Sequence, residues 1–328
     1  MPTNHNIPTS FSQQISLLKS RNLIFNDESR ALKYLSYIGY HRLAMYWNTF
    51  YVDKHTKEQF KPRIKFEDIL QLYIFDRKLR TLFMEAAERI EVCFKVLFSN
   101  ILSTTQDNAF WFLNGELFSS RKDIFYIDCK KQEEIYNHSK LLDDINSNIL
   151  KFKKNIDSLH SFSDIATTRI PSWQLVDVIT FGNFSKMISL VKGEYSTKFY
   201  EVFCLPKAIF DNWLECIVSV RNICAHYGLF YRRTFSTTPR SLSKSKKRAR
   251  LIDLEEVKST FYAEFFIFSF FMKQISPSTS WCDRVLSLIK ENLNNPHLSL
   301  ELLGFRENWY DNIIFEDKKD FFNNSTSL

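Results

Sequence analysis

The sequence predicts an all-α fold made of long helices. Only six glycines and eight prolines occur in 328 residues, so the chain has few of the residues that form turns. The 32 phenylalanines and 14 tyrosines are spread among Leu, Ile, Lys and Glu, which favours long helices over many short strands. Nearly half of the residues are apolar, enough to bury a substantial core.

The N-terminal segments predict three helices. Residues 10–20 begin with Ser10 and carry Gln13 three positions later, which is the pattern of a capping box before an amphipathic helix. Residues 27–50 predict a second and a third helix, separated at Gly39. Three side chains with possible chemistry stand at that break: Tyr40, His41 and Arg42. We interpret them as the start of a helix rather than as a site.

The middle of the chain begins with one or two long helices at 66–102, because this stretch has no glycine or proline and carries apolar residues at helical spacing. Its charged residues can pair at i, i+3 and i, i+4, so we assign them to structure first. The expected segments after it are an irregular stretch at 103–128, a charged helical stretch at 128–155, two short helices around Gly182 and Asn183 after Pro171, a long helix at 206–227, and helices at about 253–275 and 280–293.

These segments suggest an N-terminal helical region at 1–62 and a helical core at 63–328. Within the core we expect an insertion at 103–170 and a basic loop at 234–250. Internal repeats and glycine-rich phosphate loops are not found in the sequence.

Several classes of protein do not fit the sequence. The six cysteines lie far apart without a C-x-x-C pair, so we expect neither a metal site nor a disulfide framework, and no cofactor. The N-terminus has neither a basic nor an apolar signal region, so we expect a cytoplasmic protein. The most apolar window, residues 261–272, contains Glu264 and is shorter than the roughly 20 residues that span a bilayer. We interpret it as a buried core helix and expect no membrane partner.

The positive charge of the chain is concentrated in one stretch. The net charge is +7, and between Gly228 and Arg250 eight basic residues occur without an acidic one. Without these eight, 36 basic side chains face 37 acidic ones. Such a stretch indicates a polyanionic partner, and we expect RNA contacts from Arg232, Arg233, Lys244, Lys246, Lys247, Arg248 and Arg250. A solvated loop that only keeps the protein soluble is the alternative interpretation.

The strongest candidate site lies in the segment VRNICAHYGLFYRR. Near the end of a predicted helix it contains Arg221, Asn222 and His226. If the helix runs to Tyr227 and Gly228 lies just past its end, the histidine is in the last turn, where the helix dipole favours a protonated imidazole. At about 100° per residue, Asn222 and His226 share one face and Arg221 flanks it. The spacing by itself is weak, because such an Arg and His pair arises about once by chance in a chain like this.

Those residue types suit the cleavage of RNA without a metal. The reaction needs a base for the 2′-hydroxyl, an acid for the leaving 5′-oxygen, and a cation for the pentavalent phosphorane. One histidine and one arginine supply half of these groups, so two copies across a two-fold axis supply all of them. On the motif alone, however, a helix end whose polar side chains bond to exposed carbonyls is the favoured interpretation.

The segment RNICAHYGLFYRR resembles the R-N-x-x-A-H segment of the HEPN superfamily (higher eukaryotes and prokaryotes nucleotide-binding domain), and specifically that of abortive-infection proteins of the AbiD/AbiF type. Further stretches resemble the same proteins in the same order: SFSQQISLLKSRNLIFNDESRALKYLSYIGYHRLAMYW, FEDILQLYIFDRKLRTLFMEAAERIEV, PSWQLVDVITFGNFSKMISLV and LGFRENW. The resemblance therefore covers nearly the whole chain.

The resemblance implies an all-α HEPN-like helical bundle that forms a homodimer and acts as a metal-independent endoribonuclease. It also implies a role in phage defence or as a toxin, in some systems held in check by a structured noncoding antitoxin RNA. Arg221 would hold the scissile phosphate, His226 would act as acid and base, and Asn222 would orient them. Tyr227 is a departure, because many relatives carry a second histidine there.

Two alternatives from other classes stay open. The chain could be a non-catalytic protein that holds a structured noncoding RNA on its basic surface, in which case binding would weaken steeply with salt. A structural adaptor whose basic loop contacts anionic lipid is the third interpretation.

Overall fold

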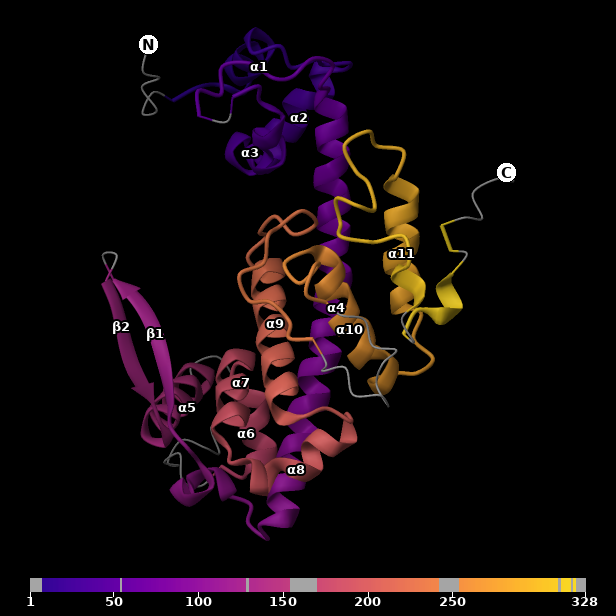
Figure 1. Cartoon of the computed structure of the whole chain (residues 1–328). Coiled ribbons are helices and arrows are strands. Elements are labelled where there is room, and N and C mark those ends of the chain that lie inside the picture. The colour runs from indigo at the N-terminus through magenta and orange to yellow at the C-terminus, as the bar shows by residue number, and fades with distance from the viewer. Residues whose placement is uncertain are drawn as a thin grey trace.

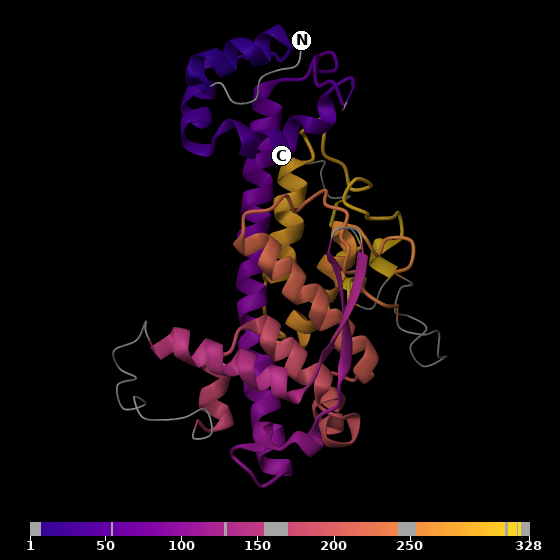
Figure 2. The same ribbon diagram turned by 90° about the vertical axis from the view of Figure 1, so that its left-hand side faces the viewer.

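A computed structural model describes residues 8–53, 55–127, 130–153, 170–241, 254–311, 314–319 and 321–322. Within these ranges the chain is largely helical, which confirms the expected all-α class. One helix, α4 (Phe66–Thr105), runs along most of the length of the molecule, and other helices pack around it (Figure 1). Figure 2 shows the same helix from a second side, with the remaining helices stacked along it.

The N-terminal helices form a small unit at the start of α4 (Figures 1 and 2). They are α1 (Phe11–Ser20), α2 (Glu28–Ile38) and α3 (Tyr40–Trp47). The expected capping box is confirmed, because the Ser10 hydroxyl accepts a hydrogen bond from the N–H of Gln13 and the Gln13 side chain accepts one from the N–H of Ser10. The break at Gly39 is also confirmed, with a φ of 86° that glycine adopts at little cost.

Helix α4 is a single helix of 40 residues, and it contacts α3, α6, α8, α9, α10 and α11. Its buried side chains recur every three or four residues, so they form an apolar stripe that winds slowly around the helix and against which neighbours pack. The Phe83 ring, for example, lies within 5.5 Å, between centroids, of four aromatic rings: Phe230, Phe261, Phe268 and Trp281. The helix therefore acts as the central support of the core.

A β-hairpin interrupts the helices between α4 and α5 (His138–Lys153). Strands β1 (Arg121–Ile127) and β2 (Lys130–Tyr136) pair antiparallel, with Arg121 opposite Tyr136. The expectation of helix throughout 128–155 is wrong for β2. The sequence KKQEEIY is polar and only weakly periodic, so pairing with β1 decides its conformation. Two short 3-10 helices, at 111–113 and 115–117, precede the hairpin.

Four helices lead from the hairpin region to the candidate site. They are α6 (Ser172–Val178), α7 (Phe181–Leu190), α8 (Gly193–Val202) and α9 (Lys207–Ala225). The helix start after Pro171 is confirmed. The two expected short helices are confirmed, but the break between them lies at 179–180 rather than at Gly182 and Asn183. The Thr180 side chain accepts a hydrogen bond from the N–H of Asn183 and caps α7 just before Gly182.

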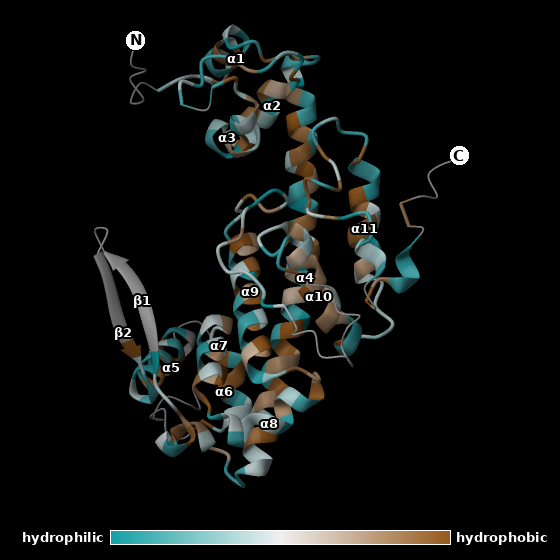
Figure 3. Ribbon diagram, viewed as in Figure 1, coloured by the Kyte–Doolittle hydropathy of each residue, from teal (hydrophilic) through white to brown (hydrophobic). Residues whose placement is uncertain are grey.

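The C-terminal helices are α10 (Phe261–Ile275) and α11 (Trp281–Asn292), with 3-10 helices at 309–311 and 316–318. Most residues of α10 are buried, as expected for a core helix, and Figure 3 shows mainly hydrophobic residues along it. It begins later than expected, because residues 254–260 form turns. Among the described residues, every helix is too short or too polar to cross a membrane.

Candidate functional site

The motif lies at the C-terminal end of α9, which stops slightly earlier than the sequence suggested. The helix ends at Ala225, His226 is the C-cap, and Tyr227 has a φ of 58°. The N–H of Tyr227 donates to the carbonyl of Cys224 (3.1 Å) and the N–H of Gly228 to that of Ile223 (2.8 Å). This is a Schellman motif in which tyrosine holds the left-handed position that glycine usually takes. The expectation that the helix runs to Tyr227 is therefore wrong.

Gly228 serves a different purpose from the one expected. A Cβ atom there would lie 3.1 Å from Cγ2 and 3.3 Å from the carbonyl oxygen of Ile223. The residue is thus glycine because the chain passes close to the last turn of α9, and not because its φ is positive.

The three predicted catalytic residues lie together on this helix end. Asn222 and His226 are exposed, and Arg221 is half-buried. A guanidinium nitrogen of Arg221 donates to the Asn222 side-chain oxygen at 3.3 Å. Among the described residues, the hydrogen bonds connect Arg221 to Asn222 and connect neither side chain to the His226 ring. One copy of the chain therefore presents a cation and an imidazole on the same end of α9 without a direct bond between them.

A buried polar network fixes the loop that follows the motif. The Asp76 carboxylate, on α4, accepts hydrogen bonds from the N–H of Phe230 (3.1 Å) and of Tyr231 (2.7 Å). It also accepts one from the Tyr46 hydroxyl (2.7 Å) and forms an ion pair with Arg80. These donors satisfy a carboxylate that is fully buried, as a charge in the interior requires.

Arg80 connects this network to the motif itself. Its guanidinium donates to the Gly228 carbonyl at 3.1 Å and to the Tyr46 hydroxyl at 3.1 Å. Because Arg80 and Asp76 lie one turn apart on the rigid central helix, the position of the chain just after His226 is set by α4. The sequence pattern assigned the charges of α4 to structure, and that interpretation fits these two residues.

The sequence pattern did not reveal the part that Arg42 plays at this site. Arg42, on α3, donates to the Tyr227 carbonyl at 3.0 Å, and its guanidinium carbon lies 5.4 Å from the centroid of the Tyr227 ring. Tyr227 itself is 63% exposed. Arg42 belongs to the group Tyr40, His41 and Arg42 noted in the sequence, but nothing in the order of the residues indicates that Arg42 contacts the motif.

Two of the predicted RNA-binding residues lie next to the motif. Arg232 is half-buried and donates to the Thr49 hydroxyl at 2.6 Å, whereas Arg233 is exposed. The start of the basic loop is attached to α9, because the Trp213 indole donates to the Arg240 carbonyl at 2.9 Å. The other five predicted RNA-binding residues lie outside the described residues: Lys244, Lys246, Lys247, Arg248 and Arg250.

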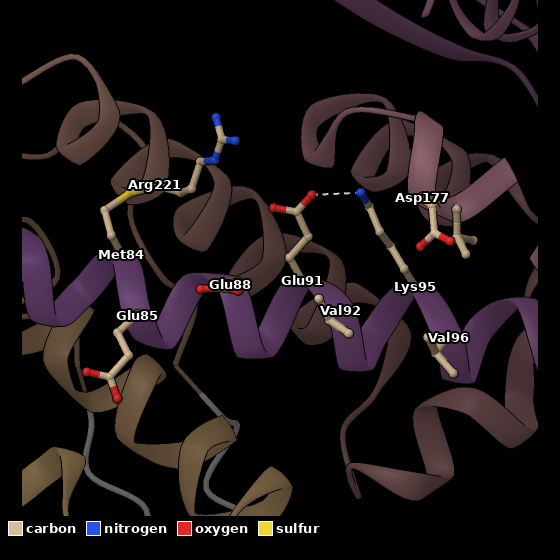
Figure 4. A pocket seen from close by; sticks show the side chains of 10 residues that line it. Met84, Glu85, Glu88, Glu91, Val92, Lys95, Val96, Asp177 and Arg221 are labelled. Atoms are coloured by element: carbon tan, nitrogen blue, oxygen red, sulfur yellow. Dashed lines mark hydrogen bonds and ion pairs between the residues drawn. The ribbon is translucent and has the colours of Figure 1, made fainter. Parts of the chain in front are cut away.

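A groove of about 460 Å³ runs between α4, α6 and α9, with Arg221 at one end (Figure 4). Exposed Val92 and Val96 line it, at 56% and 54% exposure. Acidic groups also line it: Glu85, Glu88, Glu91 and Asp177. Glu91 is paired with Lys95 at 2.7 Å, as the dashed line in Figure 4 marks. The acidic lining opposes a phosphate backbone, so the groove does not extend the basic surface.

Among the described residues, no three His, Cys, Asp or Glu side chains are grouped so that they could hold a metal ion. The motif offers an imidazole, a guanidinium and an amide, which can exchange protons and neutralise an anion.

Comparison with known proteins identifies the family. The sequence profile of the Abi-like protein family matches residues 33–232, well over half of the chain, from α2 through the motif to Arg232. No curated protein and no solved structure matches the chain. The chain therefore belongs to the Abi-like protein family, and this membership supports a role in abortive infection.

Proposed function

We propose that this Abi-like protein is a metal-independent endoribonuclease of the HEPN type, of the AbiD/AbiF kind, acting in phage defence or in a toxin-antitoxin system. A homodimer would place the motifs of two copies around one RNA strand in the cytoplasm. The products would be a 5′-hydroxyl end and a 2′,3′-cyclic or 3′-phosphate end.

The observation that carries the proposal is the arrangement at the end of α9. Arg221, Asn222 and His226 share an accessible helix end, and buried Asp76 and Arg80 hold the next residues in place. A site for phosphoryl transfer has to be both accessible and rigid, because its groups must be positioned before the substrate arrives. An ordinary helix end does not need a buried ion pair to fix the loop after it.

The chemistry follows from those side chains. The His226 imidazole of one copy would take the proton of the 2′-hydroxyl, and the imidazole of the second copy would give a proton to the leaving 5′-oxygen. Arg221 would neutralise charge on the phosphorane. In one copy the imidazole and the guanidinium are not bonded to each other, which suits a site completed by a second copy.

The test is cleavage of end-labelled RNA in EDTA by protein freed of bound nucleic acid in high salt. We expect cleavage with 5′-hydroxyl products by the wild type, and a loss of at least about 100-fold in His226→Ala, because general acid-base groups contribute about that much. His55→Ala is the matched control, an exposed imidazole in the loop between α3 and α4, and it should retain cleavage. Cleavage by His226→Ala at the wild-type rate would refute the assignment of the histidine.

A non-catalytic role in holding a structured noncoding RNA is the second candidate. It is favoured by the concentration of eight basic residues between Gly228 and Arg250, which would bind RNA with or without chemistry. If it holds, neither the wild type nor His226→Ala cleaves RNA, both bind it in a salt-sensitive way, and Arg221→Ala leaves the biological effect intact.

A further inference from the structure

We propose that the exposed ring of Tyr227 is a stacking platform for one unpaired nucleobase next to the scissile phosphate, so that the substrate is single-stranded RNA. This inference rests on the proposed RNA chemistry of the same site. It assigns a specificity role to Tyr227 and a positioning role to Arg42.

The conformation of Tyr227 is the first reason. It has a φ of 58° at the position of the Schellman motif where glycine is standard, and a bulky residue is uncommon there because its Cβ is strained. Glycine at this position would therefore suit the fold better. A strained backbone kept at a candidate site points to a function for the side chain.

The exposure of the ring is the second reason. Tyr227 is 63% exposed, so it recovers little burial energy in return for the strain. The Arg42 guanidinium lies over one face of the ring, so a flat partner would stack on the opposite face, and every nucleobase has a flat aromatic face. Unpaired bases can be turned out onto such rings, whereas bases inside an RNA duplex are stacked and paired.

The contact with Arg42 is the third reason. The Arg42 guanidinium donates a hydrogen bond to the Tyr227 carbonyl at 3.0 Å and lies 5.4 Å from the ring centroid. Tyr227 is therefore held against α3, although Arg42 and Tyr227 are 185 positions apart in the chain. A ring that is held in advance loses less conformational freedom when a base stacks on it. The guanidinium also adds positive charge beside the path of the phosphates.

The position of the ring relative to the motif is the fourth reason. Tyr227 follows His226 directly, and exposed Arg233 comes six residues later on the loop that Asp76 anchors. A strand whose phosphate lies on Arg221 and His226 would thus pass an aromatic face and further cations within a few residues. An aromatic surface among cations is the general arrangement of single-strand binding sites.

The test measures binding rather than cleavage. The probe is a single-stranded 2′-O-methyl RNA decamer, which lacks the attacking 2′-hydroxyl, and a 2′-O-methyl duplex of the same sequence is the comparison. We expect Tyr227→Gly to weaken single-strand binding by roughly 10-fold and duplex binding by less than about 2-fold, since stacking is lost only for unpaired bases. Tyr227→Phe keeps the ring and should bind like the wild type.

Matched variants separate stacking from other effects. Tyr37, on α2, is 76% exposed, and Tyr37→Gly should leave single-strand binding unchanged. Arg42→Met should weaken single-strand binding in the same direction as Tyr227→Gly but by less. When an abasic site is moved along the decamer, it should weaken wild-type binding at one position. Tyr227→Gly should not show this position-dependent loss of affinity.

The outcomes are distinct. Four outcomes would each overturn the platform. They are equal single-strand affinities for the wild type and Tyr227→Gly, equal losses of affinity for single strand and duplex in Tyr227→Gly, a changed oligomeric state without a change in RNA affinity, and no RNA binding by the wild type. If the stacking pattern appears but the protein does not cleave RNA in EDTA, the platform stands and the ribonuclease proposal fails. If cleavage depends on His226 but an abasic site weakens binding at no particular position, the ribonuclease proposal stands and the platform fails.

Discussion

At the scale of single residues, Asp76 has the greatest influence on the candidate site. Its carboxylate is fully buried and accepts hydrogen bonds from two backbone N–H groups of the loop after the motif, from Tyr46 and from Arg80. Removing one member of a buried ion pair leaves the other charge without compensation, which costs more than the pair contributes when intact.

We expect Asp76→Ala to lower the free energy of unfolding by about 3–5 kcal/mol, because Arg80 and the N–H groups of Phe230 and Tyr231 lose their acceptor. Glu28→Ala is the control, since the Glu28 ion pair with Lys19 is exposed on both sides and should be worth less than about 1 kcal/mol. Urea denaturation followed by circular dichroism measures both. A loss for Asp76→Ala as small as that of the control would contradict the role of the network.

The surroundings of Glu264 predict that it changes the stability of the protein with pH. It is completely buried in α10, and neither carboxyl oxygen has a hydrogen-bond partner among the residues that the structure describes. Burial raises the pKa of its carboxyl well above the ordinary value of 4.5. The unfolded chain therefore releases this proton at a lower pH than the native protein does, so the group makes stability fall as the pH rises above about 4.5 and adds no pH dependence below it.

We expect Glu264→Met to remove this slope and to stabilise the protein at pH 8 relative to the wild type. The contribution of the carboxyl is at most about 1.4 kcal/mol per pH unit between its unfolded and folded pKa values. Urea denaturation at pH 5, 6.5 and 8 checks the difference between the two proteins. Exposed Glu301→Met is the control and should follow the wild-type pH profile, and an identical profile for Glu264→Met would show that the buried carboxyl is not the cause.

At the scale of elements, Gly228 after the end of α9 and Gly182 at the start of α7 differ in the space around their α-carbons. Gly228 lies against the last turn of α9, where a Cβ atom would approach Ile223 at 3.1 Å. Gly182 lies in the first turn of α7, where a Cβ atom would have the Thr180 hydroxyl as its nearest neighbour, at 3.9 Å. A methyl group at the first site would crowd Ile223, which would have to shift by a few tenths of an ångström, whereas the second site has room for it.

We expect Gly228→Ala to destabilise the protein by about 1 kcal/mol, because the added methyl group crowds Ile223. We expect Gly182→Ala to stabilise it by about 0.5–1 kcal/mol, because alanine restricts the unfolded chain and favours helix. Thermal unfolding of the two variants beside the wild type measures the signs. If Gly228→Ala raised the melting temperature, the close approach at the end of α9 would be wrong.

At the scale of the whole molecule, α4 supports both the core and the candidate site. It joins the N-terminal helices, the loop after the motif and the C-terminal helices along one rigid axis, so Arg42 and Tyr227 meet although they are far apart in the chain (Figure 1). Exposed Val92 and Val96 lie on the same helix in the groove that ends at Arg221. They offer an apolar surface for the second copy that the proposed chemistry requires.

We expect the wild type to be a dimer and Val92→Glu to weaken its dimerisation by at least about tenfold, because a buried unpaired charge costs more than about 1.4 kcal/mol at an interface. Val52→Glu is the matched control, since Val52 is 66% exposed and lies far along the chain from the groove. Sedimentation equilibrium measures the dissociation constants. A monomeric wild type would remove the dimer from the proposal, and an unaffected Val92→Glu dimer would place its interface elsewhere.

The sequence by itself determined the all-α class, the capping box at Ser10, the break at Gly39, the long helix from residue 66 and the buried character of the Glu264 helix. These features depend on local periodicity and on the residues at helix ends, which the order of the chain contains directly. The sequence also identified Arg221, Asn222 and His226 as one group, because they lie within six positions of one helix. The proposed division of the chain at residue 62 stays a prediction.

Only the tertiary structure decided what surrounds that group. The strand at Lys130–Tyr136 depends on its pairing with β1, and the left-handed conformation of Tyr227 depends on the way α9 ends. The anchoring of the loop after the motif by Asp76 depends on a partner that is distant in the chain. Arg42 shows the difference most clearly, since the sequence placed it at the start of a helix, where it is, and only the packing of α3 near the end of α9 brings it to Tyr227. Local patterns fix which helices form, whereas hydrogen bonds and burial between distant segments fix which side chains meet.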